Sequence, residues 1–138
     1  YQIVDVIHAV GETVVAAAVA PDGTRVVLKY FDSPHPAPDT VARWRHEFAV
    51  LRSIDSPRII KARALESAGR SEVLVLEDFA ATNLAQLIAR QPLDLSDQLA
   101  IAIGLSRAVS DVHRHRLIHG DVAPKNVLVD PASLALRL

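Results

Sequence analysis

The chain has 138 residues, of which 50% are apolar and 22% are charged, a composition typical of a globular chain with an apolar core. Its formal net charge of −1 gives no electrostatic reason to bind nucleic acid or an anionic membrane. Cysteine is absent, which excludes disulfides and thiolate metal sites and is compatible with a cytoplasmic location. No apolar run approaches the roughly 18 residues that a membrane-spanning helix needs.

Methionine is also absent, including at position 1, so we expect the chain to be a piece of a longer protein. The last residues, 134–138, read as a strand that stops in the middle of its pattern.

The start of the chain is predicted to be β-structure. Apolar stretches over 1–7, 12–20 and 26–31 form three expected strands. The segment 21–24, Pro-Asp-Gly-Thr, has its residues in the order of a tight turn and suits a hairpin. The proline-rich segment 33–38 cannot continue a strand and is expected to be a loop.

A helix is expected over 41–54, with Asp39 or Thr40 as its cap. Glu47 lies on the same side as the apolar residues of this helix, so its carboxylate is expected near the buried face. The apolar face consists of residues that recur at spacings of three and four: Val41, Trp44, Phe48 and Leu51.

Strands are expected next over 59–65 and 72–76, on either side of a turn at 67–70. The segment 77–82 is a predicted linker, because strands dominate before it and helices after it. The remaining expected elements are a helix over 83–90, a long helix over about 96–116 that Asp94 or Ser96 caps, a strand over 127–129 and the final strand. The apolar face of the long helix is predicted to contain Leu99, Ile103, Leu105, Ala108, Val109 and Val112.

One lysine interrupts an otherwise apolar strand. Lys29 follows Val26-Val27-Leu28, where a lysine is either an edge residue whose ammonium reaches water or a phosphate ligand held by a carboxylate. Glu47 is the candidate carboxylate, although a glutamate on a helix also suits a solvated face. Neither residue alone decides between the two interpretations.

The segment 119–126, His-Gly-Asp-Val-Ala-Pro-Lys-Asn, carries the strongest chemical signal. Phosphoryl transfer needs a carboxylate that orients a hydroxyl nucleophile and accepts its proton, and an oxygen ligand for the magnesium on the nucleotide phosphates. Asp121 and Asn126 lie five residues apart on one expected loop and can supply both. An ordinary turn also favours Asp, Pro and Asn, but it does not require the histidine, the spacing or the flanking helix and strand.

Together these motifs resemble the eukaryotic-type (Ser/Thr) protein kinase family. The strand 26–29 is similar to V-A-I-K, Glu47 to the helix glutamate that pairs with that lysine, and 119–126 to the H-R-D-x-x-x-x-N loop. The segment 74–79 is similar to the hinge that receives adenine, with Leu76 at the gatekeeper position. The motifs occur in family order and cover the whole chain.

The resemblance implies an α+β, protein-kinase-like bilobal fold that is truncated. A β-rich N-lobe with one helix would span 1–76, a hinge 77–82, and the start of a helical C-lobe, through the catalytic loop, 83–138. The chain would end before the D-F-G motif, so by itself it is expected to be inactive.

The resemblance also implies roles for single residues. Asp121 would be the catalytic base and Asn126 a magnesium ligand. Lys125 would be a second catalytic residue, because Ser/Thr kinases usually carry a lysine where this chain has Ala123. The residues that would bind ATP are Lys29, Glu47, Gly11, Val14, Glu77 and Phe79.

Three departures from the family pattern, at 7–15, at Gly120 and at Ala123, keep alternatives open. The phosphate-covering loop, at 7–15, has Gly11 as its single glycine, which together with Ala123 is compatible with a nucleotide-binding pseudokinase. Gly120 replaces the usual arginine, which argues against activation through a phosphorylated activation loop. His-Gly-Asp also occurs in small-molecule kinases of the aminoglycoside phosphotransferase type. Metal binding by His113, His115 and His119 is a weaker interpretation, because His113 and His115 lie at a helix end, where histidine favours the dipole, and His119 is better explained as a side chain that braces the loop.

A closer similarity links the chain to the kinase domain that opens large bacterial multidomain signalling proteins. It rests on the segments 1–4, 21–24, 45–47 and 76–79. It implies a cytoplasmic signalling enzyme with ATP and Mg²⁺ as cofactors and a protein substrate. It also implies ATPase-like and histidine kinase modules in the same polypeptide.

Overall fold

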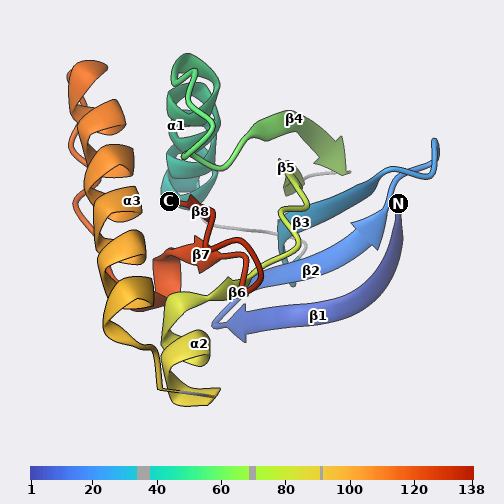
Figure 1. Cartoon of the computed structure of the whole chain (residues 1–138). Coiled ribbons are helices and arrows are strands. Elements are labelled where there is room, and N and C mark those ends of the chain that lie inside the picture. The colour runs from blue at the N-terminus through green and yellow to red at the C-terminus, as the bar shows by residue number, and fades with distance from the viewer. Residues whose placement is uncertain (34–37, 69–70, 91) are drawn as a thin grey trace. The chain divides into compact units, whose positions relative to one another are not determined.

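The computed structural model describes residues 1–33, 38–68, 71–90 and 92–138. The expected proline-rich loop lies mostly outside the described residues, as do positions 69 and 70 of the expected turn at 67–70. The described residues form two compact units (Figure 1). The first unit consists of Tyr1–Arg52 and Lys61–Asp78, and the second of Ser53–Ile60 and Phe79–Leu138.

The first unit is a five-stranded antiparallel sheet with the order β1-β2-β3-β5-β4. The hairpin between the second and third strands closes as predicted, since Gly23 N donates to Ala20 O at 2.9 Å and Thr24 N to Asp22 Oδ1 at 2.9 Å. Gly23 has a φ of +83°, which glycine adopts without strain. The strands are β1 (Gln2–Val10), β2 (Thr13–Val19), β3 (Arg25–Phe31), β4 (Ala62–Ala68) and β5 (Ser71–Glu77).

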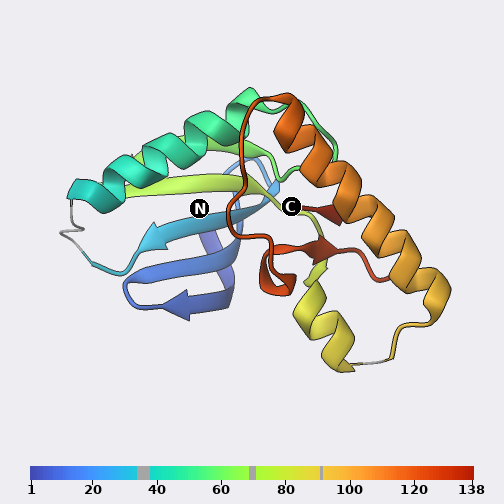
Figure 2. The ribbon, with the colours of Figure 1, turned by 90° about the vertical axis from the view of Figure 1, so that its left-hand side faces the viewer.

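Each face of this sheet has its own apolar cluster, because side chains alternate along a strand. One face buries Ala18, Val26, Leu28 and Val75. The other face is covered by α1 (Pro38–Ser53), which runs alongside β4 and β5 (Figure 2). This second cluster contains Phe31, Trp44, Ala62 and Leu74, with Phe48 and Leu51 packed against it.

The second unit is mainly helical. Asp94 is the N-cap of the long helix, its side chain accepting from Asp97 N at 2.8 Å, so of the two predicted caps the first is correct. A three-stranded sheet of order β6-β7-β8 packs with the helices. The elements are β6 (Thr82–Asn83), α2 (Leu84–Arg90), α3 (Leu95–Arg114), the 3₁₀ turn η1 (Pro124–Asn126), β7 (Leu128–Val129) and β8 (Leu136–Arg137).

This architecture confirms the predicted α+β class, an antiparallel sheet with one helix followed by the start of a helical unit. Several boundaries were predicted wrongly. The first helix begins at Pro38, so Asp39 and Thr40 lie inside it and do not cap it. The strand expected to start at Ile59 starts at Ala62, because residues 53–60 belong to the second unit and Ile59 is buried there.

The predicted apolar face of α3 was partly wrong. Leu99 and Ile103 are 53% and 51% exposed, whereas Ile101, absent from the prediction, is buried. The buried stripe runs through Ile101, Ala108 and Val112, because β8 packs against this side at Gly104. None of the described helices is long and apolar enough to cross a membrane.

Candidate active site

Lys29 and Glu47 form an ion pair within the first unit. Lys29 Nζ donates to both carboxylate oxygens of Glu47, at 2.8 Å to Oε1 and 2.7 Å to Oε2. The strand alternation of β3 places Lys29 on the face that α1 covers, and Glu47 follows the buried Trp44 by three residues, almost one helical turn. The pairing expected from the sequence is therefore present, and 23% and 38% of the two side chains are exposed.

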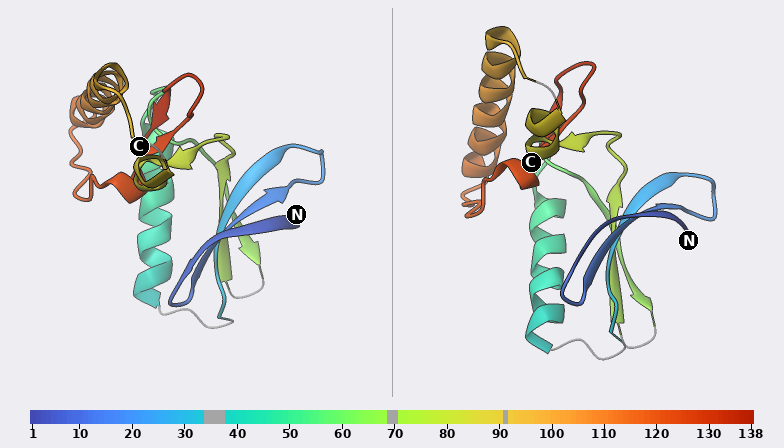
Figure 3. Two further views of the ribbon diagram at one scale, coloured as in Figure 1. Left: turned by 60° about the horizontal axis from the view of Figure 1, so that its bottom comes forward. Right: turned by 90° about the horizontal axis from the view of Figure 1, so that it is seen from below.

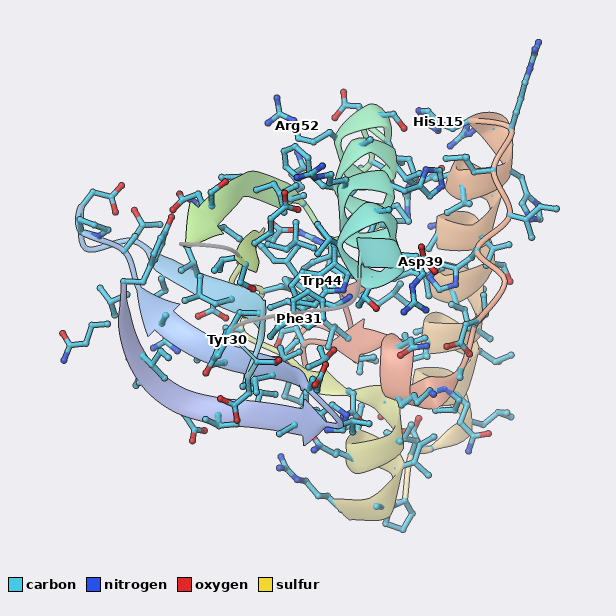
Figure 4. The ribbon with its side chains drawn as sticks, turned by 180° about the vertical axis from the view of Figure 1, so that it is seen from behind. Tyr30, Phe31, Asp39, Trp44, Arg52 and His115 are labelled. Carbon is cyan, nitrogen blue, oxygen red and sulfur yellow. The ribbon has the colours of Figure 1, made fainter. Side chains whose placement is uncertain are left out.

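An aromatic layer lies beside this ion pair. Trp44 of α1 stacks on Phe31 of β3 with ring centroids 3.9 Å apart, and Figure 4 shows the two side chains together. Lys29 Nζ is 5.3 Å from the centroid of the Trp44 ring, within the range of a cation–π interaction. These contacts restrict the lysine side chain and keep its ammonium close to Glu47.

The segment 119–126 is an exposed loop in the second unit, between α3 and β7. Asn126 closes it, because its Nδ2 donates to Asp121 O and to Asp121 Oδ2, both at 2.9 Å. The adjacent Val127 is 1% exposed and fixes the end of the loop in the core. The Asp121 side chain remains 67% exposed, so its carboxylate is oriented by Asn126 and still open to a substrate.

Three other residues of the loop surround Asp121. Gly120 has a φ of +77°, in the left-handed region that glycine adopts without strain. Asp121 N donates to His119 Nδ1 at 3.3 Å, which agrees with the expected bracing role of the histidine. Lys125 Nζ lies 4.0 Å from Asp121 Oδ2 and its side chain is 70% exposed, so the ammonium is free to move toward an anionic group.

Asn126 can supply one oxygen ligand to a hard cation. Both of the hydrogen bonds that orient this amide use Nδ2, which leaves the Oδ1 oxygen as an acceptor. Amide and carboxylate oxygens are the ligands that Mg²⁺ prefers. Among the described residues there is no group of three or more His, Cys, Asp or Glu side chains that could hold a metal. Of the three histidines considered as metal ligands in the sequence, His115 makes a 2.8 Å hydrogen bond with Asp111 O.

The expected phosphate-covering loop is a tight hairpin. Val10 pairs with Thr13, so only Gly11 and Glu12 form the turn, and Gly11 has the positive φ of +57° that the first position of such a turn requires of glycine. Val14 is 7% exposed and its side chain points to the face opposite Lys29. The residue that pairs with Lys29 and shares its face is Val15, one position further along the chain.

The two residues expected at the adenine hinge lie at the ends of their units. Glu77 ends β5, and its backbone N donates to Lys61 O at 2.9 Å while its Oε1 accepts from Lys61 N at 3.1 Å. In the second unit, the guanidinium carbon of Arg137 lies 4.3 Å from the centroid of the Phe79 ring. Both side chains are thus held by contacts within their own unit.

A buried polar network at the end of α3 escaped the sequence prediction. Asp111 is 3% exposed, and its carboxylate accepts from Ser56 Oγ at 2.5 Å, from Arg58 Nη1 at 3.0 Å and from Arg114. The hydrogen bond from Ser56 lowers the pKa of Asp111 to about 2, and the two arginines act in the same direction. An aspartate next to Val112 in an apolar stripe was the one signal in the sequence that could have revealed it.

Comparison with known proteins gives two findings. A family model described as the protein kinase domain matches residues 9–138. Serine/threonine-protein kinase 36 of Pongo abelii is 29% identical to the chain over 106 residues, which are 75% of this chain and 8% of that protein. The chain therefore spans a small fraction of the length of this curated relative.

Proposed function

We propose, from the premise that this chain belongs to the protein kinase family, that the intact domain transfers the γ-phosphoryl group of ATP to serine or threonine hydroxyls of proteins. The observation that carries the proposal is the Lys29–Glu47 pair, because kinases require a strand lysine held by a helix glutamate. The choice of serine or threonine is supported by the name of the curated relative.

Lys29 is proposed to bind the nucleotide phosphates. An ammonium has three donors, and the two bonds to Glu47 leave one for a phosphate oxygen. Because the lysine is 23% exposed, that donor is within reach of a ligand. Glu47 holds the ammonium in place, so binding a phosphate requires little further ordering of a flexible side chain.

Asp121 is proposed to orient the attacking hydroxyl and accept its proton. Asn126 occupies Oδ2 of this carboxylate, which leaves Oδ1 for the substrate. Lys125 is proposed as the second catalytic residue, since its exposed ammonium is close enough to Asp121 to meet the transferred phosphoryl group. Asn126 Oδ1 would hold Mg²⁺, which when bound neutralises charge on the phosphates.

The ATP site is proposed to include Gly11 at the hairpin turn, Glu77 and Phe79 at the hinge, and Val15 in place of Val14. The exchange follows from the strand register, because Val15 and not Val14 shares a face with Lys29. We further propose a cytoplasmic signalling role and a longer polypeptide that carries ATPase-like and histidine kinase modules. Family membership supports the ATP site. The proposed modules rest on the similarity of the segments 1–4, 21–24, 45–47 and 76–79 to such proteins.

The test is phosphate transfer from radiolabelled ATP to casein by the full-length protein that contains this chain. Asp121→Asn keeps the shape of the side chain and removes its basicity, so the rate is expected to fall by about 10²- to 10⁴-fold. Lys29→Met is expected to weaken ATP binding and transfer together. Lys61→Met is the matched control, because Lys61 is an exposed lysine of the same unit, and it is expected to leave both unchanged.

Phosphoamino-acid analysis of the product then tests the acceptor. Phosphoserine or phosphothreonine is expected, and phosphotyrosine alone would reject the proposed specificity. Transfer by Asp121→Asn at the wild-type rate would reject the assignment of the base. ATP binding without transfer by the wild type would favour the pseudokinase alternative, and transfer to an amino sugar but not to casein would favour the small-molecule alternative.

A further inference from the structure

The two edge strands of the five-stranded sheet approach each other at one end. The strand order leaves β1 and β4 at the edges, yet Tyr1 Oη donates to Glu66 Oε1 at 2.6 Å across 65 positions of sequence. Two irregularities in the pairing of β1, between Ile3 and Asp5 and between Val6 and His8, increase its twist and bend. Figures 1 and 3 show how strongly β1 curves, and the sheet is consequently a half-open barrel.

A cavity of about 300 Å³ lies inside this curl. Its floor consists of Leu28 and Tyr30 of β3 and Val73 of β5, and Ile3 of β1 forms a wall. The floor is continuous with the buried cluster of the sheet, to which Leu28 belongs. The rim is polar and is made by Tyr1, Glu66 and Ser67.

This cavity and Lys29 lie on different faces of the first unit's sheet. Leu28 and Tyr30 alternate with Lys29 along β3, so the cavity and the lysine are on opposite faces of the sheet. A ligand in the cavity would therefore not occupy the place of a phosphate held by Lys29. No residue of the proposed catalytic loop lines it.

The charge at the rim is negative. Glu66 is exposed and its hydrogen bond raises the pKa of the Tyr1 hydroxyl above its usual value, with desolvation and the charges of Glu66 and Asp22 adding to the effect. The phenol is thus a neutral donor at physiological pH, and the carboxylate carries the charge. An anionic rim over an apolar floor favours a ligand with a cationic head and an apolar body.

We propose that this cavity binds a small organic amine, with an aromatic or branched apolar group on Leu28, Tyr30 and Val73 and an ammonium paired with Glu66. The volume is at the lower end of the range for ligand pockets, about 300–1,000 Å³, which suits one ring system with a short aminoalkyl arm. The ammonium recognises Glu66 through a charge-assisted hydrogen bond.

The test compares tryptamine with indole-3-propionate, which share an aromatic ring and carry opposite charges, by titration calorimetry on the full-length protein. Tryptamine is expected to bind and indole-3-propionate is not. Glu66→Gln keeps the side-chain shape and its acceptor for Tyr1, and it is expected to weaken tryptamine binding about tenfold. Ser67→Trp places an indole at the rim and is expected to abolish binding.

Asp5→Asn is the control, because it removes a carboxylate from the same sheet at a residue that does not line the cavity. It is expected to bind tryptamine as the wild type does, and saturating ATP is expected to leave that affinity unchanged. Equal binding of the two indoles, full binding by Ser67→Trp, or displacement of tryptamine by ATP would each overturn the proposal. These outcomes do not depend on whether the domain transfers phosphate.

Discussion

Replacing Asp111 by asparagine tests the buried network at the end of α3. The substitution keeps the size of the side chain, which is buried, and removes the negative charge of the carboxylate that accepts from Ser56, Arg58 and Arg114. Breaking a buried ion pair costs about 3–5 kcal/mol when the remaining charge stays buried. Here the arginines are 36% and 71% exposed and can be solvated, so we expect a loss of about 2–4 kcal/mol in the free energy of unfolding.

The same network predicts a pH dependence with a definite sign. The pKa of Asp111 in the folded protein, about 2, is below that of an unfolded aspartate, so the unfolded state binds a proton first as the pH falls. The stabilisation is therefore complete above about pH 4 and is lost progressively toward pH 2. The difference between wild type and Asp111→Asn should shrink over that window.

The assay is urea unfolding of the wild type and of Asp111→Asn between pH 7 and pH 3. Asp55→Asn is the matched control, because Asp55 is an exposed aspartate next to Ser56, and it should unfold within about 0.5 kcal/mol of the wild type. Ser56→Ala removes the donor to Asp111 and the acceptor for Arg58 N, and it should cost about 1–3 kcal/mol. Equal midpoints for Asp111→Asn and the wild type at pH 7, or a difference that does not change with pH, would refute the reasoning.

Substitutions at three further positions of the second unit, Gly104, Arg116 and Gly120, test local strain by their urea midpoints. Arg116 lies two residues after the end of α3 and has a φ of +60°. Its N donates to His113 O, and Leu117 N donates to Val112 O, a helix-ending arrangement that favours glycine at this position. Arg116→Gly should therefore stabilise by about 0.5–1 kcal/mol, and an unchanged midpoint would contradict this. Gly104→Ala should destabilise by about 1–3 kcal/mol, although alanine has the better helix propensity, because the new Cβ would meet Cδ2 of the buried Leu136 at 2.8 Å. Adding Leu136→Val to this variant should recover most of the lost stability. Gly120→Ala should lower the free energy of unfolding by about 1–2 kcal/mol because of the φ of +77° alone, since no atom lies within 4 Å of the position that the new methyl group would take. Gly120→Asn should lower it less, because asparagine adopts this φ more readily than alanine. Equal losses for the two variants would exclude backbone strain as the cause.

The sequence predicted what local pattern and spacing can encode. The hairpin at 21–24 follows from the order of Pro, Asp and Gly. The cap of the long helix was predicted as Asp94 or Ser96, and Asp94 is the one that caps it. The contact between Lys29 and Glu47 was also predictable, because strand alternation and helix spacing fix the faces on which the two side chains lie. The family match agrees with the motifs on which the resemblance was based.

Other features depended on contacts between segments that are distant in the sequence. Apolar residues surround α3 on more than one side, and only the packing of β8 at Gly104 decided that Ile101 is buried and Ile103 exposed. Register in β2 decided that Val15 and not Val14 shares a face with Lys29, since a shift of one residue reverses the face.

The sequence by itself thus determined two polar contacts, because Lys29 and Glu47, and likewise Asp121 and Asn126, stand at spacings that a strand, a helix and one loop convert into hydrogen bonds. Only the tertiary structure decided which polar groups are buried together. Ser56 and Asp111 are 55 residues apart, and although the apolar neighbours of Asp111 indicate its burial, they do not identify Ser56 as its partner. Burial depends on the packing of the whole unit, whereas the periodicity of a sequence predicts only which side chains share a face of one helix or strand.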